Sequence, residues 1–407
     1  MHRPAAVPRT GLRERSPAQT ALLAQAQLAR MGVSRLADVT RMDGLGVPVW
    51  ISIRPRGRLL SVHAGKGLDS EQARVGAMME ALEHASAEPH RSRRLEVEQR
   101  TPAELEAAWQ GRFRLADLAP PLGATLGAQA RWTTLACEAL GAGPAMPLPA
   151  ELIFLPWSGA FGERAFFGAT GNGLASGNSV LEASVHALLE LLERDAVAMN
   201  AARDESRHVP VESLPAPWPG LALAWAREGV ELLVREIPNA FGLPCFEAVL
   251  HQPQDHTIDL AGGWGLHPSA AIAVNRAICE AAQSRVGLIH GGRDDVTGFF
   301  GKYRLPPVEL ARHTHGLLER LRDRSRQVPF AAVTAARWDG VVDLGELLAR
   351  LLAALARCGM PHVYRHAFDV DLPGLAVVKL VVPGLEHLEQ PVRRMGPRLL
   401  RRVIHDD

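Results

Sequence analysis

The chain has 407 residues, of which 47% are hydrophobic, and its formal net charge is +1. This length and hydrophobic content allow one large or two medium globular units with a substantial core. Because the chain is nearly neutral and has no long run of one sign of charge, we expect neither nucleic acid nor a membrane as a partner.

Other features of the composition indicate the compartment. The N-terminus has no apolar signal-peptide core, and no stretch approaches the length of a membrane span. The four cysteines lie in apolar contexts and form no CxxC pair: Cys137, Cys245, Cys279 and Cys358. This usage is typical of buried free thiols in a reducing compartment, so the sequence predicts a soluble, cytoplasmic protein.

The first part of the chain predicts an arm over 1–20, a helix over about 18–31 and strands over 47–55 and 59–64. A glycine turn, Gly65-Lys66-Gly67, is expected to lead into a helix over about 70–87, with Asp69 or Ser70 as its N-cap. A short helix is expected over 102–110.

The middle of the chain predicts strands around 131–137, 150–155 and 165–169. The glycine-rich segment 168–179 is expected to be one long turn that opens a second long helix. Ser179 and Glu182 stand in capping-box spacing at the start of that helix.

Strands are then expected over 231–236 and 244–251, before a third long helix that starts near Pro268 and Ser269 and ends before Gly291. The segment 292–340 has no clear period. A helix over 344–359 and a strand over 376–386 complete the pattern, and this irregular order of helices and strands predicts an α+β fold.

Each of the three long helices carries two acidic or amide side chains three residues apart. The pairs are Glu80 and Glu83, Glu190 and Glu193 (followed by Arg194), and Glu280 and Gln283. Residues at i and i+3 share a helix face, and these faces are otherwise mostly apolar. Carboxylates converging from three such helices would repel one another unless a hard cation lay among them. Mg²⁺ carrying the phosphates of a nucleotide is the candidate.

Simpler explanations and other chemistries remain open at this point. A single ExxE pair is most often a solvated helix face. The segment AGKGL (64–68) is not a phosphate-binding P-loop, because Leu60 and Gly67 stand where that motif needs glycine and Ser or Thr. Four histidines flank the helices and could form a metal-hydrolase site with the glutamates: His63, His84, His186 and His267. HExxH and GxSxG motifs are absent from the sequence.

In four blocks the sequence closely resembles the YcaO family. These are GKGLDSEQARVGAMMEALEHASAE (65–88), NGLASGNSVLEASVHALLELLERDA (172–196), HPSAAIAVNRAICEAAQSR (267–285) and VVPGLE (381–386). The N-terminal segments 11–20 and 34–55 resemble the subgroup associated with a TfuA partner. The resemblance implies a YcaO-type fold with mixed sheets and three acidic helices that converge on a nucleotide site. It also implies an N-terminal arm with the first helix and strands (1–60), a YcaO domain (61–390) and a C-terminal tail (391–407).

The family resemblance implies ATP and Mg²⁺ as cofactors and a peptide or protein as substrate. Such enzymes add a nucleophile to a backbone amide, phosphorylate the resulting oxyanion and expel phosphate. A side-chain nucleophile gives an azoline, and sulfide gives a thioamide. A homodimer and a TfuA-like or leader-recognition partner are also implied.

By the same resemblance, site roles fall on particular residues of this chain. Mg²⁺ or its shell would be held by Glu80, Glu83, Glu190, Glu193 and Glu280. Asn178 and Gln283 would position nucleotide or metal, while Lys66, Arg194 and Arg276 would contact phosphates or brace the carboxylates. Glu190, Glu193 and Arg194 are expected to be catalytic, and Arg13 or Arg15 could reach the nucleotide.

The chain departs from the family pattern at three places. Gly76 stands where the family has serine, His84 stands where it has arginine, and the tail lacks the Pro-x-Pro-x-Pro ending of azoline-forming members. The tail favours thioamide formation over cyclodehydration. The substitutions at Gly76 and His84 leave a non-catalytic, nucleotide-binding scaffold as the alternative from another class.

Overall fold

The computed structural model describes residues 12–404 apart from the following gaps: 93–94, 126, 128–129, 142, 158–164, 254–258, 294–306, 334–337, 339–340, 342 and 389–393. Its helices are α1 (Pro17–Gln25), α2 (Ser70–Ser86), α3 (Pro102–Trp109), α4 (Val180–Ala202), α5 (Trp218–Arg227), α6 (Ala270–His290), α8 (Pro307–Arg322), α9 (Leu344–Arg357) and α10 (Pro397–Ile404). Its strands are β1 (Arg35–Asp38), β2 (Val49–Ile53), β3 (Val62–Lys66), β4 (Glu98–Arg100), β5 (Trp132–Ala139), β6 (Met146–Pro149), β7 (Leu174–Gly177), β8 (Arg207–His208), β9 (Glu231–Glu236), β10 (Cys245–His251), β11 (Leu260–Leu266), β12 (Tyr364–Ala367) and β13 (Ala376–Val381).

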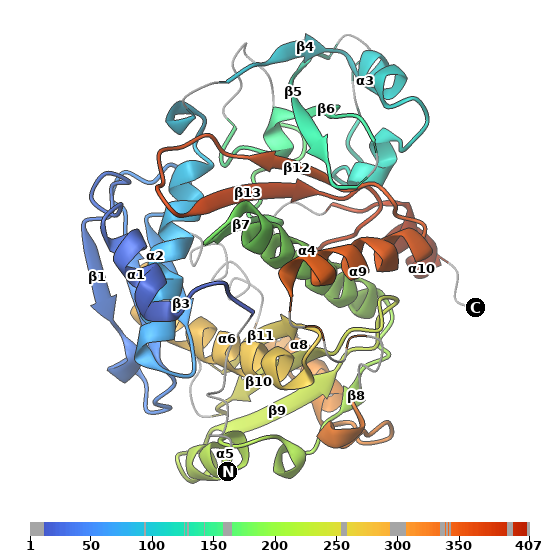
Figure 1. Cartoon of the computed structure of the whole chain (residues 1–407). Coiled ribbons are helices and arrows are strands. Elements are labelled where there is room, and N and C mark those ends of the chain that lie inside the picture. Colours follow the sequence, from blue (N-terminus) through green and yellow to red (C-terminus); the bar gives the residue numbers. More distant parts are fainter. Residues whose placement is uncertain are drawn as a thin grey trace.

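The strands form three separate sheets, and each of the three acidic helices packs on a different one (Figure 1). Helix α2 packs on the sheet β1-β2-β3, and α6 packs on the sheet β11-β10-β9-β8. Helix α4 packs on β7 and β13 of the sheet β4-β5-β12-β13-β7, in which β6 pairs with β5. The α+β prediction is therefore confirmed.

Each acidic helix follows its own edge strand and starts at a side-chain cap. Asp69, Ser179 and Ser269 adopt extended backbone angles, and their side chains accept from the backbone N–H three residues later. Such a cap satisfies one of the amides that a helix start leaves unpaired. The same local signal therefore fixes where α2, α4 and α6 begin.

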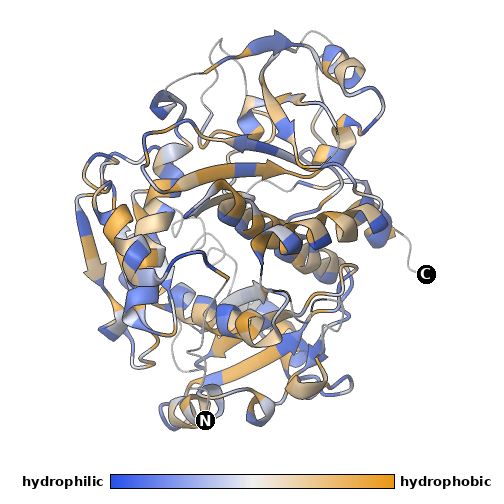
Figure 2. Ribbon diagram, in the orientation of Figure 1, coloured by the Kyte–Doolittle hydropathy of each residue, from blue (hydrophilic) through white to orange (hydrophobic). Residues whose placement is uncertain are grey.

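Hydrophobic burial joins each helix to its sheet. Figure 2 shows β13 as mostly hydrophobic and the long helices as mixed in hydropathy along their surfaces. The buried face of α4 includes Leu188 and Leu192, which cluster with Val378 and Leu380 of β13.

Within the described ranges, no helix is both long and apolar enough to cross a bilayer.

Glycines let the strands approach the helix backbones closely. A Cβ atom at Gly265 would overlap the carbonyl oxygen of Ala273 on α6, and one at Gly177 would lie 2.6 Å from the amide nitrogen of Ala183 on α4. Gly65 has the same relation to α2. Because only glycine lacks Cβ, these contacts need glycine for space rather than for an unusual backbone angle.

Two strand predictions in the middle of the chain are wrong. The segment 150–155 begins as a 3-10 helix, Ala150–Leu152, and 165–169 is not a strand. For the segment 165–169 the reason is Glu151, whose carboxylate accepts from the amides of Phe166 at 2.9 Å and Gly168 at 2.7 Å. These amides are therefore bonded to a side chain instead of a neighbouring strand.

The expected glycine turns are shorter than predicted. Gly65 and Lys66 belong to β3, and residues 174–177 of the segment 168–179 form β7. Within 292–340, where no period was evident, the structure has the helix α8, whose Leu318 and Leu321 pack against Leu233 and Val249. Parts of that segment lie outside the described residues.

The two ends of the chain pack on the central helices. Helix α1 packs on α2, and α10 packs on α4, where Arg398 pairs with Asp195 at 2.6 Å. The division at residue 60 falls between the paired strands β2 and β3. The division into an arm, a main domain and a tail stays a prediction, and residues 1–11, 391–393 and 405–407 lie outside the described part.

We predict that Gly265→Ala lowers the free energy of unfolding by about 1–3 kcal/mol, because the added methyl group must push β11 away from α6. Urea unfolding followed by circular dichroism measures the effect. The matched control is Gly287→Ala on α6, where a Cβ meets open space and the variant should gain up to about 1 kcal/mol. Equal stability of Gly265→Ala and wild type would show that the close approach is not needed.

Candidate active site

The second side chain of each acidic pair bonds to the strand that precedes the next acidic helix. Glu83 of α2 accepts from the amide and hydroxyl of Ser176 in β7, at 2.9 and 2.6 Å. Glu193 of α4 accepts from the amide of Leu266 in β11, at 2.9 Å. Gln283 of α6 donates to the carbonyl of Ala64 in β3, at 2.8 Å. These bonds close a ring of α2, α4 and α6, which we call the three-helix ring.

The direction of each bond explains the residue type. Glu83 and Glu193 meet N–H groups, which need an acceptor, and a carboxyl oxygen provides one. Gln283 meets a carbonyl oxygen, which needs a donor that a carboxylate lacks. The pattern ExxE, ExxE, ExxQ therefore follows from which backbone atom faces each helix.

The first side chain of each pair bonds to a neighbouring backbone amide or to a lysine. Glu80 accepts from the amide of Ala64 at 3.0 Å, and Glu190 accepts from the amide of Gly173 at 3.3 Å. Glu280 pairs with Lys66 of β3. A carboxylate offers about four acceptor positions, so these bonds do not exhaust the capacity to bind a cation.

Electrostatics shows that the carboxyl groups from α2 and α4 act on one another. Burial raises the pKa of Glu83 to about 8, and the charges of Glu80 and Glu190 add to the rise. Burial also raises the pKa of Glu190 to about 7, with Glu193 adding and Arg194 opposing. Some carboxyls of the metal-free cluster are therefore protonated near neutral pH, as expected where like charges crowd together.

Cations surround the third carboxylate. Burial acts to raise the pKa of Glu280, but the charges of Lys66 and Arg194 outweigh it and lower that pKa. The charge of Arg276 also lowers the pKa of Glu280, and its guanidinium lies 3.9 Å from Glu193. Lys66, Arg194 and Arg276 therefore all act on Glu280.

This donor set fits Mg²⁺. Mg²⁺ binds oxygen ligands and is commonly held by a few carboxylates together with substrate phosphates. Protonated carboxyls beside like charges would release their protons to solvent when such a cation binds. Glu80, Glu83, Glu190 and Glu280 would be available to hold it, while Glu193 is almost fully buried.

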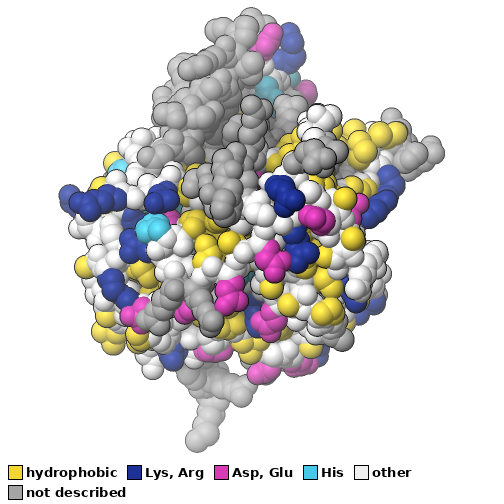
Figure 3. All heavy atoms as spheres, turned by 90° about the horizontal axis from the view of Figure 1, so that it is seen from above, with side chains coloured by type: hydrophobic (Ala, Val, Ile, Leu, Met, Phe, Trp, Pro, Cys, Tyr) yellow, Lys and Arg dark blue, Asp and Glu magenta, His cyan; other side chains and the backbone are white. Residues whose placement is uncertain are grey.

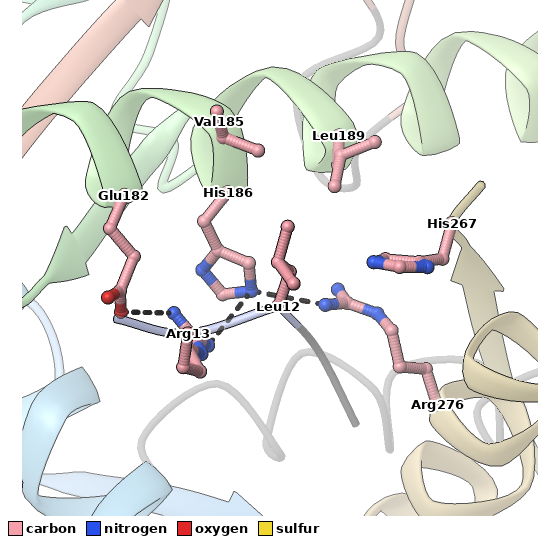
Figure 4. A pocket seen from close by; sticks show the side chains of 8 residues that line it. All are labelled: Leu12, Arg13, Glu182, Val185, His186, Leu189, His267 and Arg276. Carbon is pink, nitrogen blue, oxygen red and sulfur yellow. Dashed lines mark hydrogen bonds and ion pairs between the residues drawn. The ribbon is translucent and has the colours of Figure 1, made fainter. Parts of the chain in front are cut away.

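A basic pocket adjoins the carboxylates (Figure 4). It is lined by Leu12, Arg13, Glu182, Val185, His186, Leu189, His267 and Arg276. The Nε2 atom of His186 lies 3.4 Å from Arg13 and 3.1 Å from Arg276. Two guanidinium groups from different elements therefore meet at one imidazole, an arrangement suited to an anion such as phosphate.

The pocket histidines are neutral. Burial, with the charges of Arg13 and Arg276, holds the pKa of His186 well below its usual range. The same causes lower the pKa of His267 to about 3, and its Nδ1 accepts from the amide of Ser269. Its Nε2–H has no hydrogen-bond partner among the described residues. That donor is available to a ligand.

Asn178 lies apart from the carboxylate cluster and anchors the N-terminal arm. Its amide group donates to Glu182 at 3.0 and 3.1 Å and accepts from Thr20 at 2.9 Å. Arg15 donates to the carbonyls of Gly374 at 2.8 Å and Asn178 at 3.3 Å. The nucleotide-positioning role of Asn178 stays a prediction.

Sequence reasoning missed the role of Glu182. Ser179 caps α4, but the carboxylate of Glu182 accepts from Arg13 at 3.2 Å and from the amide of Glu14 at 2.9 Å. The expected capping-box role is therefore wrong for Glu182. A signal was present, because Glu182, His186, Glu190 and Glu193 follow helical spacing on one face of α4.

The structure accounts for the two unusual residues of α2. A Cβ at Gly76 would lie only 3.2 Å from the Cα of Gly65, so glycine at this point eases the contact between α2 and β3. The ring of His84 lies 4.7 Å from the ring of His63. Neither residue disturbs the three-helix ring.

Comparison with known proteins decides the family. A family model described as YcaO cyclodehydratase, ATP- and Mg²⁺-binding, matches residues 64–386. The chain belongs to the YcaO family. The resemblance drawn from the motifs is confirmed, and the cofactors of this YcaO protein are ATP and Mg²⁺.

Two relatives are similar over most of their length. An uncharacterised protein of Methanothermobacter thermautotrophicus is 31% identical, covering 94% of this chain and 97% of its own. An uncharacterised protein from the tfuA 3′ region of Rhizobium leguminosarum bv. trifolii is 30% identical, covering 91% of this chain and 88% of its own.

Solved structures share the fold. The YcaO protein from Methanopyrus kandleri, bound with AMPPCP and Mg²⁺, aligns with a TM-score of 0.75 and 22% identity over 96% of this chain and 97% of its own. A heterocyclase in complex with substrate and cofactor aligns with a TM-score of 0.74 and 20% identity over 98% of this chain. This YcaO chain spans 56% of that heterocyclase chain.

We predict that the stability of the metal-free protein falls as pH rises from about 4.5 to about 8 because of Glu83. Its folded pKa is raised, so over this range the unfolded state has released a proton that the folded state still holds. Glu83→Gln cannot ionise, and its melting temperature should fall less than that of wild type across the range. Mg²⁺ should stabilise wild type at the upper end and the variant much less.

Thermal melts in EDTA, with and without added Mg²⁺, measure both effects. Glu346→Gln on α9 is the control, because it removes an exposed glutamate paired with Arg350 and should keep the pH profile of wild type. Parallel profiles for wild type and Glu83→Gln would contradict the assignment.

Proposed function

We propose that this YcaO protein uses ATP and Mg²⁺ to activate a backbone amide of a peptide by O-phosphorylation, and that it forms a thioamide with sulfide as nucleophile. The observation that supports this is the three-helix ring itself. It contains two carboxyl groups with raised pKa, Glu83 and Glu190, and a third, Glu280, whose pKa is lowered by Lys66, Arg194 and Arg276. Phosphoryl transfer depends mainly on positioning and neutralisation of charge, which these residues supply.

The roles of the residues follow from their positions. Glu80, Glu83, Glu190 and Glu280 would hold Mg²⁺, which supplies charge neutralisation to the transferred phosphoryl group. Arg276 stands between the carboxylates and the basic pocket, because it approaches both Glu193 and His186. Arg13, Arg276 and His267 would therefore bind phosphate oxygens, with Arg194 and Lys66 fixing the carboxylates.

The net reaction conserves atoms. Sulfide adds to the amide carbonyl, and the resulting oxyanion takes the terminal phosphoryl group of ATP. Phosphate then leaves with the former amide oxygen, giving a thioamide, ADP and inorganic phosphate. Without phosphorylation, the amide oxygen is a very poor leaving group.

One observation favours sulfide over a side-chain nucleophile, and another supports a partner protein. Residues 397–404 form the helix α10 on α4, held by Arg398, which pairs with Asp195 and donates to the carbonyl of Gly384 at 2.9 Å. This segment is therefore not an extended proline-rich strand. The relative encoded in the tfuA 3′ region supports a TfuA-like partner.

The alternative within the same class is an azoline-forming cyclodehydratase. The alternative from another class is a nucleotide-binding scaffold without turnover.

Recognition of the peptide would come from the partner protein or an accessory surface. On the face shown in Figure 3, the described basic and acidic side chains are interspersed. A homodimer and a cytoplasmic location are also part of the proposal.

We expect ATP·Mg²⁺ to bind wild type in calorimetry and not to bind the double variant Glu190→Gln, Glu280→Gln, because that variant removes two converging carboxylates. The control is Glu71→Gln, Glu346→Gln, which removes the same number of charges from exposed positions. Equal binding by both double variants would contradict a nucleotide site at the three-helix ring.

Mass spectrometry of a candidate peptide, incubated with ATP, Mg²⁺, sulfide and a TfuA-like partner, separates the two chemistries. Exchange of oxygen for sulfur raises the peptide mass, whereas cyclodehydration lowers it by one water. Mass gain with release of ADP supports thioamide formation, and mass loss establishes the cyclodehydratase instead. ATP binding without any ATP consumption would favour the scaffold.

A further inference from the structure

His63 of β3 is a buried histidine whose two ring nitrogens lack hydrogen-bond partners within the described ranges. The residue is 0% exposed, and both Nδ1 and Nε2 are enclosed by protein. A buried polar group without a partner costs free energy comparable to a lost hydrogen bond or more. The family reaction proposed above gives this imidazole no role. Its unpartnered nitrogens therefore indicate that the imidazole binds a ligand.

Two further metal-ligating side chains face His63 from α2. Glu80 and His84 lie four residues apart, which places them on the same face of the helix. One ligand atom from each of the three residues lies within 4.8 Å of the others, and the two histidine rings are 4.7 Å apart. The site therefore joins neighbouring elements, β3 and α2, which pack together through Gly65 and Gly76.

The donor set differs from that of the carboxylate cluster. Mg²⁺ is bound by oxygen ligands, whereas imidazole nitrogen suits Zn²⁺ and its neighbours Co²⁺ and Ni²⁺. Two histidines and one glutamate are a common set of three protein ligands for Zn²⁺, with the fourth position left for water or another small ligand.

We propose that His63, Glu80 and His84 bind a divalent transition-metal ion of the zinc type, at a site that shares only Glu80 with the carboxylates expected to hold the nucleotide's Mg²⁺. The unusual residue His84 supplies the second imidazole, in place of the arginine that stands there in the family pattern. An arginine has no lone pair to give a metal, so this site depends on a feature of this chain.

The geometry needs a modest closure. Ligand atoms at about 2.0–2.1 Å from Zn²⁺ in a tetrahedral arrangement lie about 3.4 Å apart. Rotation of the Glu80 and His84 side chains on α2 brings the observed spacing of up to 4.8 Å to this value. Glu80 also accepts from the amide of Ala64, a bond that orients its carboxylate toward β3.

Nearby cations act against a metal, and one of them is paired with a carboxylate. Arg54 and Arg293 both act electrostatically on His63. The guanidinium of Arg54 lies 3.0 Å from the buried carboxylate of Glu88, which offsets its charge. The carboxylate of Glu80 supplies a negative charge inside the site itself.

The test is metal binding by the full-length protein, without nucleotide or peptide. Apo protein is titrated with Co²⁺ in the presence of millimolar Mg²⁺, the visible d–d absorption is recorded, and bound Zn²⁺ is measured by elemental analysis. We expect one ion per chain, with absorption typical of low coordination number. Millimolar Mg²⁺ should weaken Co²⁺ binding only slightly, because two of the three ligands are imidazoles and Mg²⁺ prefers oxygen. Because no ATP is used, failure here leaves the proposed function untouched.

Matched variants locate the site. His84→Arg and His63→Phe should each weaken binding by more than about 100-fold, which exceeds the usual loss when only an outer partner of a ligand is removed. His208→Gln is the control, since His208 is also buried with an unpartnered Nδ1 but lies on β8. Thermal melts establish that each variant is folded.

Binding lost in both ligand variants and kept in the control supports the proposal. No bound Zn²⁺ or Co²⁺ in folded wild type would overturn it, and would assign the imidazole nitrogens to a buried water molecule. Equal binding by wild type and His84→Arg would also overturn it.

Discussion

The rest of the structure depends on three hydrogen bonds that tie each acidic helix to the strand before the next one. Glu83, Glu193 and Gln283 make these bonds to backbone atoms of β7, β11 and β3. A typical net hydrogen bond contributes about 0.5–1.5 kcal/mol, and a backbone partner is held in place by its own sheet. The ring therefore fixes the relative positions of three sheets whose strands do not pair with one another.

This ring also explains the division of labour within each pair. The side chain at i+3 bonds to the next sheet. The side chains at i make other bonds: Glu80 accepts from the amide of Ala64, Glu190 accepts from the amide of Gly173, and Glu280 pairs with Lys66. Burial, with a smaller contribution from neighbouring carboxylates, raises the pKa of Glu83 and Glu190, so a divalent cation that binds them would displace protons.

Helix α4 connects this centre to both ends of the chain. At its start, Glu182 receives Arg13 and the backbone of Glu14 from the N-terminal arm. Further along, Asp195 receives Arg398 of α10. The arm thereby brings Arg13 beside Arg276, which lies next to the carboxylates, so one helix links the anion pocket, the metal cluster and the C-terminal helix.

Much of this was predictable from the sequence because the signals are local. Three helix starts are predicted by their N-cap residues, Asp69, Ser179 and Ser269. The i, i+3 pairs show which helix faces carry polar groups. The order of the blocks then predicts the family and its cofactors.

Tertiary structure alone decided what those side chains contact. Glu182 has capping-box spacing, yet the arm takes its carboxylate, and Glu151 takes the amides that a strand at 165–169 would have used. His63 and His84 are 21 positions apart and show no ligand spacing in the sequence, but the glycine contact of β3 and α2 brings their rings together. Helix starts depend on bonds within a few residues, whereas these contacts join segments whose separation is set by packing of the whole chain.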